Sequence, residues 1–341
     1  MSEAIKPLLE KLQGGGALDE TEIATAFNAL MSGGCEQEDI KSFLSLTTPF
    51  MADPNLIAGG ARAMRSRMIK VNAPADAIDV CGTGGDGAHT LNISTTVAFV
   101  LAGAGVPVAK HGNRAMSSKT GTADVLEALG VKLTADPATL ERALTEAKIA
   151  FLFAQNHHPA MRYVAQARRE LNHRTIFNLL GPLTNPAGVK RQLVGVFDGA
   201  LVKPVAQALS SLGCERGWVV HGAGGVDELS WSQSGANIVA TIENGVIGAV
   251  QFDSGDEAGD PKDLRGGTAE ENAAQLRALL DGSSQNDAYR FAVELNAGAA
   301  FVVAGLAARL QDGIILANHY LRTGAGMKPL EALIDISNSA P

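Results

Sequence analysis

The sequence predicts an α/β fold in which a mainly parallel sheet follows a helical N-terminal region. Two patterns predict this fold. Over the first 70 residues, apolar side chains recur at three- and four-residue steps, which is typical of helices that each bury one face. From Ala77 onward, short apolar runs alternate with helical stretches, which is typical of parallel strands connected by helices.

The N-terminal region is expected to contain several short helices. Asp19 with Thr21 can cap a helix whose apolar positions include Ile23 and Phe27, and residues 38–46 repeat the same spacing. Gly33-Gly34 and Pro54 separate these short helices.

The α/β region has an expected order of elements. Strands are expected at 78–81, 106–109, 149–153, 192–197 and 218–221, and a hairpin at 238–242 and 246–252 turns at Asn244-Gly245. Helices are expected at 95–102, 123–129, 138–147, 269–280 and 288–310. Between about 156 and 190 the alternation lapses into a polar, arginine-rich stretch, which we interpret as a return to the helical layer.

The composition excludes several classes of protein. Of the 341 residues, 46% are hydrophobic, as in a globular protein. The formal net charge of −8 argues against a general nucleic-acid binder. The longest apolar run, 97–109, is interrupted by Gly103, Gly105 and Pro107 and is shorter than the roughly 20 residues of a membrane helix. The first ten residues lack the pattern of a secretory signal, so we expect a cytoplasmic protein without a membrane partner.

Three cysteines, Cys35, Cys81 and Cys214, are far apart in the sequence. An odd number at this spacing favours isolated reduced thiols over a disulfide or zinc framework. A bound metal ion would therefore have to use oxygen ligands.

Residues 82–87, GTGGDG, are the strongest local signal, with four glycines directly after an expected strand. Such a backbone can turn its N–H groups inward to bind phosphate oxygens. Asn92 opens the next helix, whose free N–H groups favour anions. Hydroxyls at Thr90, Ser94 and Thr95 can donate to phosphate, and Ser94 can also ligate magnesium. Taken alone, the segment could equally be an ordinary glycine-rich turn, and it matches neither a Walker loop nor the dinucleotide fingerprint.

Residues 110–119, KHGNRAMSSK, follow a second strand. Ligands bind beyond the carboxyl ends of strands in open parallel sheets. Lys110, Arg114 and Lys119 concentrate positive charge in an acidic chain, so we interpret the loop as the locally basic site that a phosphate ligand needs. The alternative is a solvated basic loop.

Asp227 and Glu228 follow a third glycine-rich turn, residues 221–225. Adjacent carboxylates suit magnesium, which takes one or two carboxylates together with substrate phosphates and water. By itself such a pair is more often an exposed surface feature, and two phosphate-suited loops nearby favour the metal site.

The arginine-rich stretch contains Arg168, Arg169 and Arg174, together with His157 and His158. Arginine is suited to two-pronged recognition of a carboxylate. The alternatives are surface charges for the arginines and helix-cap or core-edge positions for the histidines.

Together these segments resemble the anthranilate phosphoribosyltransferase family, from the N-terminal helices to the final helix. Leu91, Thr122 and Asn172 stand where the family commonly has Phe, Ser and Gly. The matching strings are GTGGDG at 82–87, NIST at 92–95, KHGNRAMSSKTGTADVLEALG at 110–130, HPAMRYVAQARREL at 158–171, RTIFNLLGPLTNPA at 174–187, HGAGGVDELS at 221–230 and LNAGAA at 295–300.

The resemblance implies a transferase of tryptophan biosynthesis. Members of this family join the phosphoribosyl group of 5-phosphoribosyl 1-pyrophosphate (PRPP) to the amine of anthranilate, release pyrophosphate, and use Mg²⁺. It also implies a small helical domain, residues 1–72 and 156–190, packed on a larger α/β domain with a mainly parallel central sheet, residues 73–155 and 191–341, and a homodimer.

The resemblance further implies the site residues. Magnesium is expected at Ser94, Asp227 and Glu228. Anthranilate is expected to meet Gly82, Asn113 and Arg168, with His111, His158 and Pro182 along its path. The amine is already neutral near pH 7, so no general base is assigned, and His111 and His158 are candidates. PRPP is expected to contact Gly82, Gly85, Asp86, Thr90, Asn92, Ile93, Ser94, Thr95, Lys110, His111, Gly112, Asn113, Arg114, Ala115, Met116, Ser117, Ser118 and Thr122.

Two other kinds of protein share the expected architecture. A pyrimidine nucleoside phosphorylase has a related serine-lysine loop, but that family carries a further C-terminal domain and lacks this Asp-Glu pair. A non-catalytic nucleic-acid-binding relative should be basic and should lack an intact GTGGDG loop, whereas this chain is acidic and has the loop.

Overall fold

The computed structural model describes residues 2–114, 120–134, 136–231, 235–252 and 261–339. Within them, seven strands form one sheet in the order β3-β2-β1-β4-β5-β6-β7. The first five strands along the chain pair in parallel, and β6 and β7 extend the sheet as an antiparallel hairpin. The strands are β1 Ile78–Gly82, β2 Val108–Gly112, β3 Ile149–Phe153, β4 Arg191–Gly195, β5 Arg216–His221, β6 Asn237–Glu243 and β7 Val246–Phe252.

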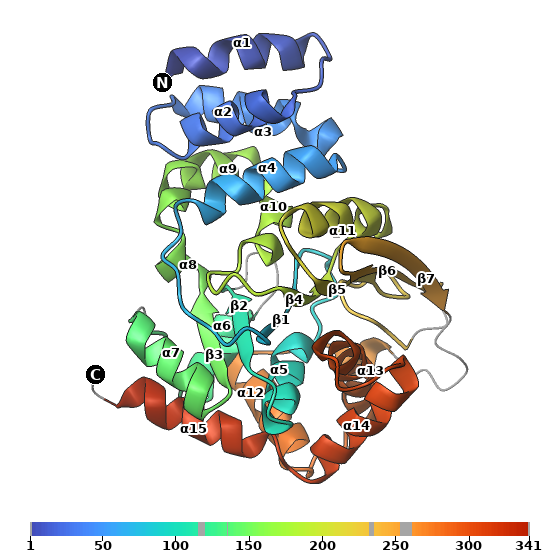
Figure 1. Cartoon of the computed structure of the whole chain (residues 1–341). Coiled ribbons are helices and arrows are strands. Elements are labelled where there is room, and N and C mark those ends of the chain that lie inside the picture. The colour runs from blue at the N-terminus through green and yellow to red at the C-terminus, as the bar shows by residue number, and fades with distance from the viewer. Residues whose placement is uncertain (1, 115–119, 135, 232–234, 253–260, 340–341) are drawn as a thin grey trace.

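The N-terminal helices form a layer at one end of the molecule, at the top of Figure 1. They are α1 Ser2–Gln13, α2 Glu20–Leu30, α3 Gln37–Leu46 and α4 Pro54–Arg65. Two short helices from the middle of the chain, α9 Ala165–Leu171 and α10 Phe177–Leu180, pack on α3 and α4 respectively. The chain therefore returns to the helical layer, which supports the expected domain division, although its boundaries stay a prediction.

The sheet separates two hydrophobic cores. Neighbouring strand residues point to opposite faces, so Val219 and Val220 of β5 belong to different cores, as do Leu193 and Val194 of β4. On one face lie α5 Ile93–Gly103 and α13 Asp287–Ala304, and on the other α11 Val202–Ser211 fills the space between the sheet and α4. The sheet is thus covered on both faces, as parallel sheets are.

Short helices complete the chain around the sheet (Figure 1). They are α6 Thr122–Ala128, α7 Pro137–Glu146, α8 Ala154–His157, α12 Ala269–Leu280, α14 Leu310–Arg322 and α15 Met327–Asn338, with 3-10 turns η1 Thr48–Phe50, η2 Pro159–Tyr163, η3 Pro182–Thr184, η4 Gly199–Leu201 and η5 Pro261–Leu264. Among the described residues, no helix is both long and apolar enough to cross a membrane.

Local signals explain where several elements begin and end. Asp19 caps α2 by accepting a hydrogen bond from Glu22 N, and the Glu22 carboxylate accepts one from Asp19 N. The β6–β7 turn is built by Asn244 and Gly245, both with positive φ (49° and 85°), as a tight hairpin requires. The hairpin was predicted from this dipeptide and is confirmed.

The expected helix at 288–310 is wrong at its C-terminal end. Helix α13 ends at Ala304, because the next residue, Gly305, adopts φ 86° in the left-handed region. The chain then turns and α14 packs back on α13. Helices α14 and α15 were not among the expected elements, although their buried residues recur at the three- and four-residue steps typical of a helix.

Phe27 joins the N-terminal helices to the returning segment. Its ring is fully buried and meets Phe43 of α3 and Phe177 of α10 edge-on, with centroids 5.6 and 5.9 Å away. It also packs against Gly60 of α4, where a Cβ atom would lie 2.8 Å from its Cζ.

We therefore expect Phe27→Ala to lower the free energy of unfolding by about 3–5 kcal/mol, because it leaves a cavity where four helices meet. Urea unfolding followed by circular dichroism measures this loss. Phe27→Leu serves as the control and should lose less. A change in Phe27→Ala within the error of the wild type would show that the layer does not depend on this ring.

Candidate active site

The carboxyl ends of the parallel strands carry the loops that the sequence singled out. The loops after β1, β2 and β5 surround a cavity of about 270 Å³. Its lining residues are Cys81, Gly82, Thr83, Gly84, Gly85, Asp86, Gly87, His89, Thr90, Leu91, Asn92, Ser94, Lys110, His111, Gly112, Asn113, Arg114, Thr120, Gly121, Thr122, Asn178, Asp227 and Glu228.

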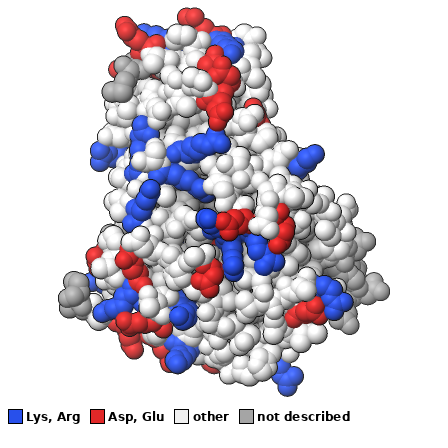
Figure 2. All heavy atoms as spheres, in the orientation of Figure 1, with Lys and Arg blue, Asp and Glu red and all other residues white. Residues whose placement is uncertain are grey.

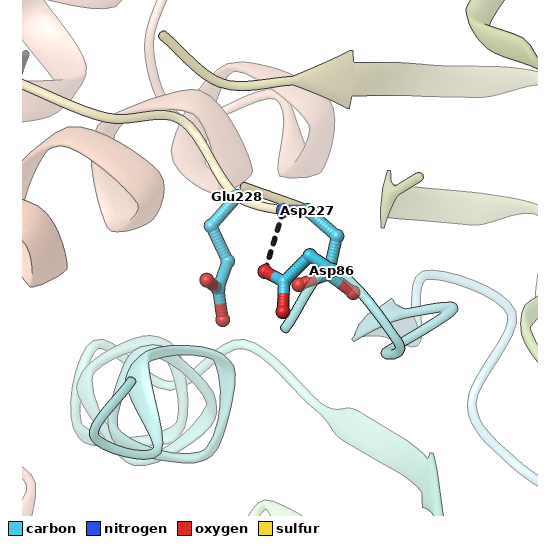
Figure 3. A group of neighbouring side chains, drawn as sticks. All are labelled: Asp86, Asp227 and Glu228. Carbon is cyan, nitrogen blue, oxygen red and sulfur yellow. Dashed lines mark hydrogen bonds between the residues drawn. The ribbon is translucent and has the colours of Figure 1, made fainter. Parts of the chain in front are cut away.

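Three carboxylates converge in this cavity. Figure 3 shows Asp86 from the loop after β1 facing Asp227 and Glu228 from the loop after β5. One ligand oxygen of each lies within 4.8 Å of the others, and Asp227 N donates a 3.2 Å hydrogen bond to Asp86 Oδ2. The expected pair thus lies in the cavity, and Asp86 joins it as a third carboxylate.

Burial makes this cluster costly without a cation. Burial and the Asp86 charge raise the pKa of Asp227 to about 7, and burial with the charge of Asp227 raises the pKa of Glu228 well above its ordinary value. Among the residues that the structure describes, no group forms a hydrogen bond with the buried Glu228 Oε2 atom. An unpaired carboxylate oxygen beside two other acids matches the ligand set that a hard divalent cation prefers.

Glycines allow the 227–228 loop to enter the sheet edge. A Cβ atom at Gly195 of β4 would overlap the backbone oxygen of Asp227, and one at Gly222 would overlap that of Glu228. A Cβ at Gly82 would collide with the Asp227 carboxylate, whose Oδ2 accepts a 2.7 Å hydrogen bond from Gly84 N. Close backbone approach therefore places the carboxylates.

Glycines in the 82–87 loop serve a different purpose. Gly84, Gly85 and Gly87 have φ of 62°, 78° and 79°, in the region that other residues rarely adopt. A Cβ atom at Gly85 would have open space around it, with Arg174 Nε the nearest atom at 3.9 Å. Glycine at position 85 is therefore required by its backbone conformation.

Lys110 is part of a buried network beneath the cavity. Its Nζ donates to Val80 O at 2.6 Å and to Ser94 Oγ at 3.2 Å, and the side chain is 2% exposed. Burial lowers its pKa, and the nearby charge of Asp79 opposes this shift. Asp79 was not singled out from the sequence, yet it is fully buried and accepts hydrogen bonds from His111 N and from Asn185 Nδ2.

The interpretation of residues 110–119 as one basic loop needs correction. Lys110 lies in strand β2 and is buried, and Arg114 forms ion pairs with Asp124 at 2.7 Å and Glu127 at 2.6 Å. Its charge is therefore largely balanced by the following helix. Lys119 and the expected ligands Ala115, Met116, Ser117 and Ser118 lie outside the described residues.

On the face drawn in Figure 2, Lys and Arg side chains gather across the middle of the molecule, where the upper helices meet the larger part.

Two expected PRPP ligands do not line either cavity described here. Ile93 is buried in the core, and Thr95 is buried with its hydroxyl donating to Thr122 Oγ1 at 3.2 Å. Both lie in the first turn of α5. The Ile93 N–H donates to Leu91 O at 2.7 Å, so the backbone N–H that remains for a ligand on these two residues is that of Thr95.

A second cavity, of about 230 Å³, lies between the helical layer and the sheet. It shares a wall with the first, formed by Cys81, Gly82, Thr83, His111, Gly112, Asn113 and Asn178. Its other lining residues are Met64, Ala154, Gln155, His158, Met161, Arg168, Phe177, Gly181, Pro182 and Thr184. All six residues expected to meet anthranilate or line its path therefore lie around one cavity.

Arg168 supplies positive charge to this mostly apolar cavity. It comes from α9, and its guanidinium lies 5.5 Å from the centre of the Phe177 ring. Burial lowers its pKa, but an arginine side chain remains cationic in proteins. Arg169 is exposed, while Arg174 donates to Gly85 O and lies 4.1 Å from the centre of the Phe197 ring. Of the three arginines, Arg168 alone lines the second cavity.

His111 and His158 are buried and contact each other at the shared wall. Their Nε2 atoms are 3.3 Å apart, and His111 Nδ1 lies 3.0 Å from Gly181 O. Burial lowers the pKa of His158 to about 4 and that of His111 well below its ordinary value, so both rings are neutral at pH 7. His111 must then donate from Nδ1 to Gly181 O and accept at Nε2 from His158.

The backbone conformation of Asn172 accounts for one departure from the family pattern. It ends α9 with φ 49°, in the left-handed region, where the family commonly has Gly. Asparagine is the residue other than glycine that tolerates this conformation best. The substitution therefore preserves the turn that carries Arg168.

Comparisons with known proteins agree with this geometry. Residues 74–327 match the model of a glycosyl transferase family, a/b domain, which defines the class of enzyme. The chain is 48% identical to anthranilate phosphoribosyltransferase of Rhodopseudomonas palustris (strain BisB18) over 98% of both chains, and 51% identical to that of Maricaulis maris (strain MCS10) over 94% of both. The chain belongs to the anthranilate phosphoribosyltransferase family, and the two alternative kinds of protein are set aside.

Solved structures give the same result for the fold. Anthranilate phosphoribosyltransferase from Thermus thermophilus aligns with a TM-score of 0.91 at 41% identity, covering 99% of this chain and all of that one. The enzyme from Saccharomyces cerevisiae in complex with PRPP and Mg aligns with a TM-score of 0.90 at 25% identity, covering 100% of this chain and 99% of that one. The expected small helical part on a larger α/β part is confirmed.

Gly195→Ala tests whether close backbone approach positions the acidic loop. We expect the new methyl group to push Asp227 away, lower the free energy of unfolding by about 1–3 kcal/mol, and reduce activity. Gly14→Ala is the matched control, because a Cβ there makes only ordinary contacts, 3.5 Å or more. Urea unfolding and an activity assay compare the two variants. Equal behaviour would contradict the role given to Gly195.

Proposed function

We propose that this chain transfers the 5-phosphoribosyl group of PRPP to the amine of anthranilate and releases pyrophosphate in tryptophan biosynthesis. The observation that carries the proposal is the pair of adjoining cavities. One has a glycine loop, a helix N-terminus and an acidic cluster, which suit a phosphorylated sugar with a divalent cation. The other is mostly apolar with one half-buried arginine, which suits an aromatic carboxylate.

PRPP is placed in the first cavity. We assign to it Gly82, Gly85, Asp86, Thr90, Asn92, Ser94, Lys110, His111, Gly112, Asn113, Arg114 and Thr122, all of which line that cavity. Thr95 belongs to the assignment through its backbone N–H, and Ile93 and residues 115–118 belong to it by resemblance.

The residues of the acidic cluster fit magnesium. Asp227, Glu228 and Ser94 are the proposed ligands, and the geometry adds Asp86 to the candidate set. The unpaired Glu228 Oε2 is the observation that tests the fit, because a buried carboxylate oxygen requires a donor or a cation. When bound, magnesium neutralises the charge that develops on the pyrophosphate leaving group.

Anthranilate is placed in the second cavity. Arg168 binds its carboxylate, Gly82 and Asn113 contact it at the shared wall, and Pro182 with His158 bounds the path into it. Held this way, the ring lies on the helical side and its amine points through the shared wall toward the sugar.

The chain's own residues then act mainly by position. The first cavity orients the anomeric carbon, and Arg168 orients the amine, so that the two reactants meet as in an intramolecular reaction. Backbone N–H groups of the 82–87 loop and the first turn of α5 donate to phosphate oxygens. Displacement forms the new C–N bond as the bond to pyrophosphate breaks, and the amine then loses a proton.

The neutral histidines limit the choice of proton acceptor. His111 Nε2 accepts from His158, so it can take a proton only if this contact opens. Both remain candidates, and a strong base is not obligatory for a neutral amine.

The same proposal includes the setting of the enzyme. By resemblance the protein works in the cytoplasm as a homodimer, with small-molecule substrates and with neither nucleic acid nor membrane as a partner. The net charge of −8 supports the exclusion of nucleic acid.

The direct test mixes the purified protein with PRPP, magnesium and anthranilate and follows the loss of anthranilate fluorescence. We expect the loss to require all three components and to release pyrophosphate. A fluorescence signal that stays constant at saturating PRPP and magnesium would contradict the proposed function.

The double variant Asp227→Asn, Glu228→Gln removes the charges of the proposed metal site but keeps its shape. We expect turnover to fall by at least about 10²-fold, because leaving-group charge is no longer balanced. Folding should be preserved, because neutral amides cost less to bury than carboxylates. Glu331→Gln, an exposed carboxylate of α15, is the control. Wild-type rates in the double variant at limiting magnesium would rule out this site.

Arg168→Ala tests the placement of anthranilate. Losing a charge-assisted hydrogen bond costs about 1.5–3 kcal/mol, so the anthranilate KM should rise roughly ten- to hundredfold. The PRPP KM should stay close to the wild-type value, and kcat should fall only if Arg168 also aligns the amine. Arg169→Ala, the exposed neighbour on the same helix, is the control. Steady-state kinetics with each substrate varied in turn decide the matter, and a variant that lost PRPP affinity alone would put Arg168 on the wrong side.

A further inference from the structure

A short segment between β7 and α12 lies against both loops of the first cavity. Residues 264–268 pair with residues 89–91 of the first loop in antiparallel fashion and also reach the start of the 120–122 segment. The hydrogen bonds are Leu91 N to Leu264 O at 2.7 Å, Gly266 N to His89 O at 2.8 Å, and Thr120 Oγ1 to Gly267 O at 2.8 Å. We call residues 264–268 the strap.

Two side-chain amides connect the strap to the cavity wall. Gly267 N donates to Asn272 Oδ1 at 2.7 Å, and Asn272 Nδ2 donates to Asn92 Oδ1 at 3.0 Å. Asn272 is in the first turns of α12 and is 2% exposed, whereas Asn92 lines the cavity. These two hydrogen bonds form a relay. It runs from the Gly267 N–H through the buried Asn272 amide to the Asn92 side chain, which a ligand can reach.

The backbone fixes the direction of this relay. A main-chain N–H can only donate, so Asn272 must turn its oxygen toward Gly267. Its NH₂ group then faces Asn92, which must accept with its own oxygen. The relay therefore uses the Asn92 oxygen and leaves the Asn92 NH₂ group for a ligand in the cavity that Asn92 lines.

The strap is shaped to keep Asn272 close. A Cβ atom at Gly266 would lie 2.9 Å from Asn272 Nδ2 and 3.0 Å from Thr90 O, which is too near for an ordinary contact. Glycine at this position lets the backbone of the strap lie directly on the amide. The helix that carries Asn272 is itself anchored at Thr268, whose Oγ1 accepts from Glu271 N at 3.2 Å.

We propose that Asn272 is a positioning residue for the PRPP site, which holds the Asn92 amide so that it presents hydrogen-bond donors, and no acceptor, to the phosphate or ribose oxygens. The proposal rests on the proposed function, in which PRPP occupies this cavity. Asn272 touches no substrate and acts through Asn92 alone. If the Asn92 oxygen faced a phosphate oxygen, the two acceptors would repel each other. The orientation of the Asn92 amide therefore matters more than its presence.

Asn272→Asp tests the direction. Its carboxylate still accepts from Gly267 N, but its second oxygen must receive a donor, so Asn92 turns its NH₂ inward and faces PRPP with an oxygen. We expect the PRPP KM to rise by about tenfold or more, with the anthranilate KM unchanged. Asn272→Ala frees Asn92 to turn either way, so its PRPP KM should rise less. This second variant keeps the test available if Asn272→Asp does not fold.

A double-mutant cycle separates positioning from a general structural effect. In an Asn92→Ala background, Asn272→Asp should cause no further rise in the PRPP KM, because the group it acts through is gone. Asp19→Ala is the stability control: it removes the cap of α2 in the N-terminal helical layer and leaves the strap and α12 intact, so it should lower the melting temperature and leave the PRPP KM unchanged.

Two results would overturn the proposal. One is a wild-type PRPP KM in Asn272→Asp, and the other is an equal rise in the PRPP KM with and without Asn92. A wild-type protein without PRPP-dependent activity would instead contradict the proposed function. In that case, PRPP titrations by calorimetry on the same variants would still decide whether Asn272 acts through Asn92.

Discussion

The entry of the 227–228 loop into the edge of the sheet is the constraint on which the site depends. The loop backbone lies where side chains would otherwise stand, so Gly195 and Gly222 cannot carry a Cβ atom without displacing it. This approach places the buried Asp227 and the half-buried Glu228 beside Asp86, and desolvation of their carboxylates raises the pKa of both. A cluster that is costly without a cation is well prepared to bind one, because the cost is removed on binding.

The two cavities follow from the way the helical layer meets the sheet. The chain leaves β3, adds α9 and α10 to the N-terminal helices, and returns to the sheet at β4. Arg168 is thereby carried to the same cavity as Gly82 and Asn113, which belong to the sheet side. A reaction between a phosphorylated sugar and an aromatic amine needs both environments within reach of each other, and an interface between two parts of a chain provides them.

Buried polar groups beneath the cavities hold this arrangement in place. Asp79 supports Lys110 by its charge and His111 by a hydrogen bond, and Asn272 connects the strap to Asn92. None of these supports faces solvent, so each must be satisfied within the protein. The fixed directions of their hydrogen bonds prepare the cavity walls before any ligand arrives.

The sequence by itself determined the strands, most helices, the glycine loop and the Asp-Glu pair, because these depend on local periodicity and local backbone freedom. Asn244-Gly245 predicted a tight hairpin since both residues tolerate positive φ. Only the tertiary structure decided that Asp86 joins the acidic cluster and which face α14 and α15 cover. These features depend on contacts between segments far apart in the chain, which no local pattern encodes.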